Sequence, residues 1–88
     1  MAKVKLPYTV NNRLAEYIQR KAEQTNSTIT EIEAELAEYC NLTVNEKGKA
    51  EAIKKYKQGN IDPSLPVAMR ICEYFGTSME EMYKLMEV

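Results

Sequence analysis

Residues 59–83 read GNIDPSLPVAMRICEYFGTSMEEMY, and this stretch predicts two helices with well-marked ends. Gly59 suits the left-handed position that closes a preceding helix, and Pro63 is tolerated in the first turn of the next one. Gly76 ends that helix, whose expected apolar face consists of Leu65, Ala68, Ile71, Cys72 and Phe75. A short fifth helix follows, capped by Ser78 and bearing Met79, Met82, Tyr83 and Met86.

Two further helices are predicted upstream, each with a recognisable start. Asn11 or Asn12 caps the first, and Thr28 with Glu31 forms a capping box for the second. Their apolar residues recur at helical spacing. These are Leu14, Tyr17, Ile18 and Ala22 in the first helix, and Ile29, Ile32, Leu36, Tyr39 and Cys40 in the second.

The third helix has two alternative starts. Thr43 with Glu46 repeats the capping-box pattern, so the helix could begin there. In the other arrangement, residues 44–48 form a polar turn and the helix begins near Lys49. Gly48 weakens a helix by about 1 kcal/mol relative to Ala, which favours the second arrangement. In both, Ala50, Ile53 and Tyr56 point inward and Gln58 is the last residue.

The segment before the first helix is not helical in pattern. Val4 to Val10 alternates apolar and polar residues, and Pro7 restricts such a segment to an edge strand or an extended arm. We therefore expect residues 1–11 to be an arm or edge strand and residues 12–88 to be one domain. The fold class predicted is all-α, a compact five-helix bundle.

Composition limits what a chain of this kind does. Its 88 residues are 44% hydrophobic and 28% charged, which is typical of a single soluble domain. No apolar run approaches the roughly 18 residues of a membrane span, and no signal-peptide core is recognisable, so a cytoplasmic location without membrane contact is expected.

The residue types present exclude several kinds of site. The chain has no His, which excludes histidine bases and histidine–zinc sites. Cys40 and Cys72 fall among apolar helix positions and are interpreted as small core residues. We accordingly expect no enzyme activity, no metal and no cofactor.

The charges are segregated along the chain although the net charge is −1. Residues 22–46 contain six acids and no base, whereas residues 47–60 contain five lysines and one acid. Phosphate neutralisation is local, so one basic face is enough for nucleic-acid binding.

Residues 59–83 resemble the C-terminal half of the Cro and phage-repressor (XRE) family of helix-turn-helix domains. The residues in step with the family pattern are Gly59, Pro63, Ser64, Leu65, Ala68, Ile71, Phe75, Gly76, Ser78, Glu80 and Met82. Upstream, Leu36-Ala37 matches the usual Leu-Ala pair of the second helix, and Asn41 stands at the usual turn glycine. The chain departs from the pattern around residues 46–51, where it is longer, and it lacks the glutamine that often opens the second helix.

The resemblance implies a lambda-repressor-like fold and a double-stranded DNA-binding transcriptional regulator, similar to repressors of phages and mobile elements. In that family the third helix enters the major groove and its first residues touch base edges. By position these are Thr43, Val44, Asn45 and Lys47, with Asn45 expected to pair with adenine. The expected phosphate contacts are Lys54, Lys55 and Lys57, with Lys47 and Lys49 added if they lie in a loop, and Thr28 and Thr30 near the start of the second helix.

The resemblance also implies a homodimer, because relatives commonly dimerise through the C-terminal region. The expected contact residues are Met79, Met82, Tyr83 and Met86, since a thin core cannot bury them all. Strand pairing by the N-terminal arm is a second candidate for the contact.

The acids of the second helix support an alternative function. Glu31 and Glu33 would repel DNA at the helix start, and Glu31, Glu35 and Glu38 recur on one side. The alternative is a protein-interaction module on the same fold, an antirepressor or a partner-binding regulator, that acts through this acidic face.

Overall fold

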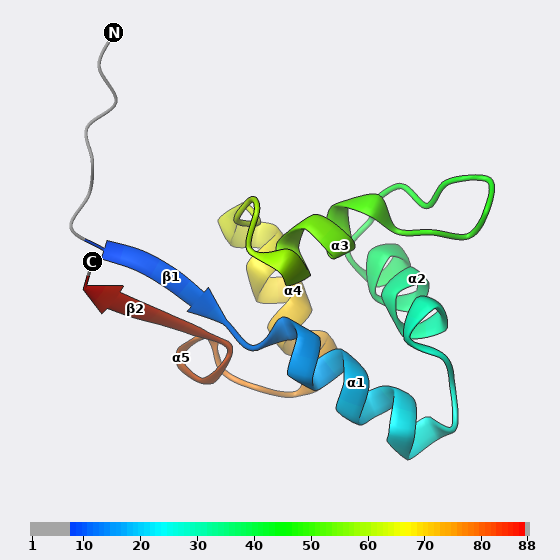
Figure 1. Ribbon diagram of the computed structural model, residues 1–88, viewed down its shortest axis with the longest axis horizontal. Coiled ribbons are helices and arrows are strands. Elements are labelled where there is room, and N and C mark those ends of the chain that lie inside the picture. Colours follow the sequence, from blue (N-terminus) through cyan, green and yellow to red (C-terminus); the bar gives the residue numbers. More distant parts are fainter. Residues whose placement is uncertain (1–7, 88) are drawn as a thin grey trace, which may run out of the picture.

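The computed structural model describes residues 8–87, with side chains from residue 10 to residue 85, and it is mostly helical (Figure 1). The elements in chain order are β1 (Tyr8–Asn12), α1 (Leu14–Thr25), α2 (Ile29–Tyr39), α3 (Glu51–Gln58), α4 (Leu65–Phe75), α5 (Met79–Met82) and β2 (Tyr83–Glu87). The first seven residues of the expected arm lie outside the described part. No helix within the described residues is both long and apolar enough to cross a membrane.

The start of α2 and the ends of α3 and α4 lie where the sequence predicts them, and local capping chemistry sets each of them. Thr28 Oγ1 accepts a hydrogen bond from the Glu31 amide at 3.1 Å, and Glu31 Oε1 accepts one from the Thr28 amide at 2.9 Å. The predicted capping box of α2 is therefore confirmed. Gly59 and Gly76 both adopt left-handed backbone conformations after α3 and α4, as expected of helix-closing glycines.

Helix α3 starts late, at Glu51, which confirms the second of the two predicted arrangements. Thr43 and Glu46 do not cap a helix. The backbone of Gly48 has a φ of +74°, which a right-handed helix does not accommodate, so the segment turns before it becomes helical.

The two ends of the described chain form a sheet. Strand β1 pairs antiparallel with β2, so that Val10 lies opposite Leu85 and Asn12 lies opposite Tyr83 (Figure 1). The expected fifth helix through Met86 is therefore wrong beyond Met82, and the fold is not purely α. The backbone N–H and C=O groups of residues 83–87 find hydrogen-bond partners through pairing with β1. In a longer helix the same groups would bond within the segment.

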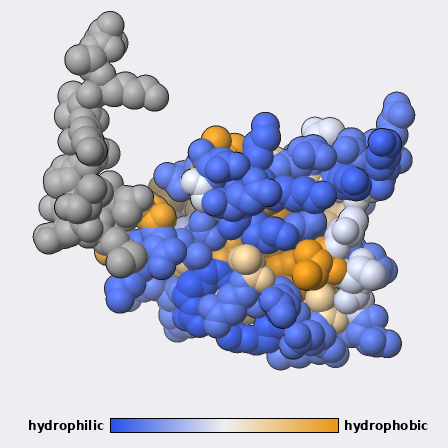
Figure 2. All heavy atoms as spheres, viewed as in Figure 1, coloured by the Kyte–Doolittle hydropathy of each residue, from blue (hydrophilic) through white to orange (hydrophobic). Residues whose placement is uncertain are grey.

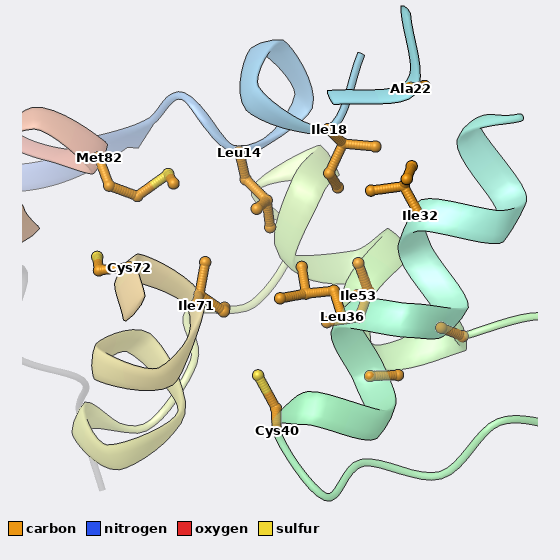
Figure 3. Close-up of a cluster of buried hydrophobic side chains, with 12 residues drawn as sticks. Leu14, Ile18, Ala22, Ile32, Leu36, Cys40, Ile53, Ile71, Cys72 and Met82 are labelled. Atoms are coloured by element: carbon orange, nitrogen blue, oxygen red, sulfur yellow. The ribbon is translucent and has the colours of Figure 1, made fainter. Parts of the chain in front are cut away.

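The five helices within residues 8–87 all contribute to one apolar core (Figure 3). The largest fully buried side chains are Leu14, Ile18, Ile32, Leu36, Ile53, Ile71 and Met82, together with Glu33. Each buried aliphatic side chain contributes about 1.5–3 kcal/mol relative to an exposed one. Leu65, expected on the buried face of α4, is instead 65% exposed, because that face begins one turn later at Ala68.

Candidate nucleic-acid interface

A buried ion pair joins α2 to α3. The Glu33 side chain is 1% exposed, and its Oε2 lies 2.8 Å from Lys57 Nζ. An isolated carboxylate is very costly to bury, so the ammonium group of Lys57 is committed to Glu33. Two expectations are corrected here: Lys57 is not a free phosphate contact, and Glu33 is not a surface acid that would repel DNA.

The other two lysines of α3 remain outside the core. Lys55 is exposed and Lys54 is half-buried. Neither forms an ion pair with another described residue. Since Ala50 and Ile53 are buried, the outward positions of α3 are Glu51, Lys55 and Gln58, spaced at i, i+4 and i+7.

The segment between α2 and α3 is a long loop that extends beyond the helices (Figure 1). It presents Thr43, Asn45, Lys47 and Lys49 as exposed residues. The space-filling view is mostly hydrophilic over this part of the molecule (Figure 2). Val44 is half-buried and packs against the core, so it is not free to touch a base edge as expected.

The side chain of Asn45 is occupied inside this loop. Its Oδ1 accepts hydrogen bonds from the amides of Lys47 at 3.0 Å and Lys49 at 2.9 Å. Its Nδ2 lies 3.4 Å from Glu51 Oε1. Both lone pairs of Oδ1 are therefore used within the chain, and a bidentate adenine contact needs Oδ1 as an acceptor, which contradicts the expected role of Asn45 as a base reader.

The start of α2 carries the two threonines predicted to lie near phosphate. Both are exposed. The capping bond uses an acceptor lone pair of the Thr28 hydroxyl group and leaves its proton free to donate. Glu31 lies beside them, and its hydrogen bond from the Thr28 amide lowers the pKa of its carboxyl group, so Glu31 is ionised at neutral pH.

The residues expected at a dimer contact do not form one surface. Met82 is 0% exposed and belongs to the core, so it is not accessible to a second chain. Met79 and Tyr83 are half-buried against the same core. The Met86 side chain lies outside the described part. The prediction of a contact on a fifth helix is wrong for Met82, because the single-turn α5 directs it inward.

A different apolar surface lies nearby, which we call the α4–sheet surface and define as Val10, Leu65, Met69 and Leu85. Leu65, Met69 and Leu85 are more than half exposed and Val10 is 37% exposed. Val10 and Leu65 line one hollow of about 260 Å³, and Met69 lines an adjacent hollow of about 620 Å³. This surface was not predicted because Leu65 was placed on the core face, although Leu65 and Met69 share one side of α4 at i and i+4.

Other chemistry is limited among the described residues. No group of three metal-ligating side chains converges within residues 10–85. Cys40 and Cys72 are buried free thiols, and burial raises the pKa of both. A raised thiol pKa makes the reactive thiolate scarce at neutral pH.

Comparison of the chain with protein-family models, curated proteins and solved structures found no match.

Proposed function

We propose that this chain is a sequence-specific double-stranded DNA-binding transcriptional regulator, with α2 and α3 acting as a helix-turn-helix pair. In this proposal α3 enters the major groove and the start of α2 lies across the phosphate backbone. The exposed polar residues on the outward face of α3 are Glu51, Lys55 and Gln58. Glutamine pairs with adenine and lysine with guanine, so this face replaces Asn45 as the reading surface.

The observation that carries the proposal is the arrangement of lysines along one continuous segment. Lys47, Lys49 and Lys55 are exposed, Lys54 is half-buried, and all four belong to the loop and helix between residues 47 and 55. Glu33, one of the two acids expected to repel phosphate, is buried against Lys57, whereas the other, Glu31, is exposed. Local positive charge therefore exists on a chain whose net charge is −1.

A homodimer is part of the proposal, and the α4–sheet surface supports it. Adjacent exposed apolar side chains of this kind are frequently found at protein contacts. A two-fold pair of chains would also read two half-sites of one duplex. Met79 and Tyr83 border the surface through the hollow that they share with Val10 and Leu65.

The proposal is tested by selecting bound duplexes from a random pool and measuring the affinity of the winning site at several salt concentrations. We expect a preferred sequence and an affinity that falls steeply with salt. Lys55→Ala is expected to lower the salt slope by about 0.9, whereas Lys84→Ala, an exposed lysine on β2, leaves it unchanged. Failure to recover any enriched sequence would reject sequence-specific binding.

The alternative, a protein-interaction module, has one observation in its favour. Glu31, Glu35 and Glu38 are all exposed on α2, and none forms an ion pair with another described residue. A basic protein partner would match this row. The absence of duplex binding at low salt, with retained folding, would favour the alternative over the DNA-binding proposal.

A further inference from the structure

Within the loop between α2 and α3, the hydrogen bonds of one residue, Asn45, close residues 45–49 into a tight turn. Besides its two side-chain acceptor bonds, Asn45 donates from its backbone amide to the Lys49 carbonyl at 3.0 Å and accepts from the Gly48 amide at 2.9 Å. Its side-chain amide also reaches Glu51 at the start of α3. Asn45 thus fixes both ends of residues 45–49, which we call the Asn45 loop, and ties the loop to α3.

Gly48 supplies the second requirement for this closure. Its φ of +74° lies in the left-handed region, where other residues are strained. A Cβ atom added at Gly48 would meet nothing within 4 Å. A substitution at Gly48 would therefore strain the closed loop through its backbone alone, without a clash and without a change of charge.

The closed loop has a consequence for the two lysines that it holds. The amides of Lys47 and Lys49 are fixed by the same oxygen, so their side chains leave a defined backbone while their ammonium groups remain in solvent. Ordering a flexible segment at the moment of binding costs affinity, and a segment already ordered avoids that cost. The hydrogen bonds of the loop therefore define the backbone that carries the two cations.

We propose that Asn45 is a positioning residue that holds Lys47 and Lys49 ready to bind DNA phosphates beside α3. This inference rests on the proposed DNA-binding function and adds to it a cationic loop whose geometry, and not only its charge, determines affinity. Asn45 itself touches no phosphate and reads no base.

The test is a comparison of duplex affinity and salt slope across charge-neutral and charge-removing variants, measured on a random-sequence duplex between about 50 and 200 mM salt. Asn45→Ala and Gly48→Ala open the loop and keep both lysines. Each is expected to weaken binding roughly fivefold to tenfold while leaving the salt slope within experimental error of the wild type. Lys47→Ala is expected to lower the slope by about 0.9.

Two controls match these changes elsewhere in the chain. Gly76→Ala strains a left-handed glycine with equal open space, at the end of α4. Asn11→Ala removes an exposed asparagine side chain from β1. Both are expected to leave duplex affinity unchanged. Thermal unfolding of every variant is measured alongside. A loop that only supports α3 would lower the melting temperature, and Asn45→Ala would then still weaken binding after Lys47 and Lys49 had been replaced.

The decisive arm places Asn45→Ala in a chain that already carries Lys47→Ala and Lys49→Ala. If Asn45 acts through the two lysines, the added change weakens binding by less than about twofold. A full fivefold loss in that background would show that Asn45 acts directly or through α3, and would overturn the inference. If the wild type binds duplex and neither Asn45→Ala nor Gly48→Ala changes its affinity, the positioning role of Asn45 is rejected and the DNA-binding proposal stands. If the wild-type chain binds no duplex, the DNA-binding proposal itself is rejected.

Discussion

Lys57 Nζ lies 2.8 Å from Glu33 Oε2, and this pair joins α3 to α2 at the margin of an apolar core. Glu33 is almost fully buried, whereas a quarter of the Lys57 side chain reaches solvent. The lysine stem covers the core and carries its charge to Glu33, the one buried acid among residues 10–85. The relative placement of the two helices that form the candidate interface therefore depends on an electrostatic contact as well as on packing.

Removing one member of this pair is expected to destabilise the chain strongly. Lys57→Ala leaves the Glu33 carboxylate buried without its cation, at a cost of about 3 kcal/mol. Replacing both residues with apolar ones of similar size, as in Glu33→Leu with Lys57→Met, is expected to recover most of that loss. Urea unfolding measures both. Equal stability of wild type and Lys57→Ala would show that the pair contributes nothing.

Met82 gives a sharp contrast with its neighbour Leu85. Met82→Glu places an unpaired carboxylate in the core, so we expect the chain to be largely unfolded at neutral pH. Leu85→Glu changes a side chain that is 69% exposed within one chain, so at protein concentrations where the chain is monomeric it is expected to shift the melting temperature little. Circular dichroism melts separate the two outcomes. A cooperative melt of Met82→Glu near that of the wild type would contradict the placement of Met82.

The α4–sheet surface predicts where assembly is sensitive to charge. Leu65→Glu and Met69→Glu are each expected to shift a dimer toward monomer, because an interface core disfavours an unpaired carboxylate. Ile29→Glu is the matched control, since Ile29 is an exposed apolar residue on α2. Sedimentation at micromolar concentration measures the change. A dimer that survives both α4 changes would place the contact elsewhere.

The α2 capping box predicts a pH dependence. The hydrogen bond from the Thr28 amide lowers the pKa of Glu31, so its ionised form stabilises the fold above the ordinary glutamate pKa. That stabilisation is lost as the pH falls through the lowered pKa. Glu31→Gln keeps a hydrogen-bonding side chain but not the charge. We expect the wild type to be more stable than Glu31→Gln at neutral pH and the difference to vanish in acid; a difference independent of pH would refute this origin.

Local signals in the sequence predicted the helices well, because their ends depend on neighbouring residues. Thr28 with Glu31, Gly59 and Gly76 define helix ends through contacts within one turn. Strand β2 was missed because its partner, β1, lies at the other end of the chain. A stretch such as Tyr83–Glu87 shows no strand pattern strong enough to reveal a pairing that distant.

Glu33 was expected to be a surface acid, but the sequence pattern around it indicates that it is buried. Glu33, Leu36, Ala37 and Cys40 share one helical stripe at i, i+3, i+4 and i+7, and all four are buried. The prediction instead extended the stripe through Ile29, which is 42% exposed. A charge does not by itself indicate solvent exposure, because a carboxylate on an apolar stripe can have a partner such as Lys57. The role of Asn45 was harder to predict, since it depends on hydrogen bonds between Asn45 and four other residues, Lys47, Gly48, Lys49 and Glu51.

The most direct test of the central claim is the salt dependence of duplex binding by the wild-type chain. Four lysines, Lys47, Lys49, Lys54 and Lys55, are proposed to neutralise phosphates, so the logarithm of the binding constant should fall against the logarithm of salt with a slope of about −3 to −4 per chain. Alanine at all four positions should abolish most of that slope while the chain remains folded. A folded wild-type chain that binds no duplex at low salt, or a slope that the four substitutions leave unchanged, would contradict the account.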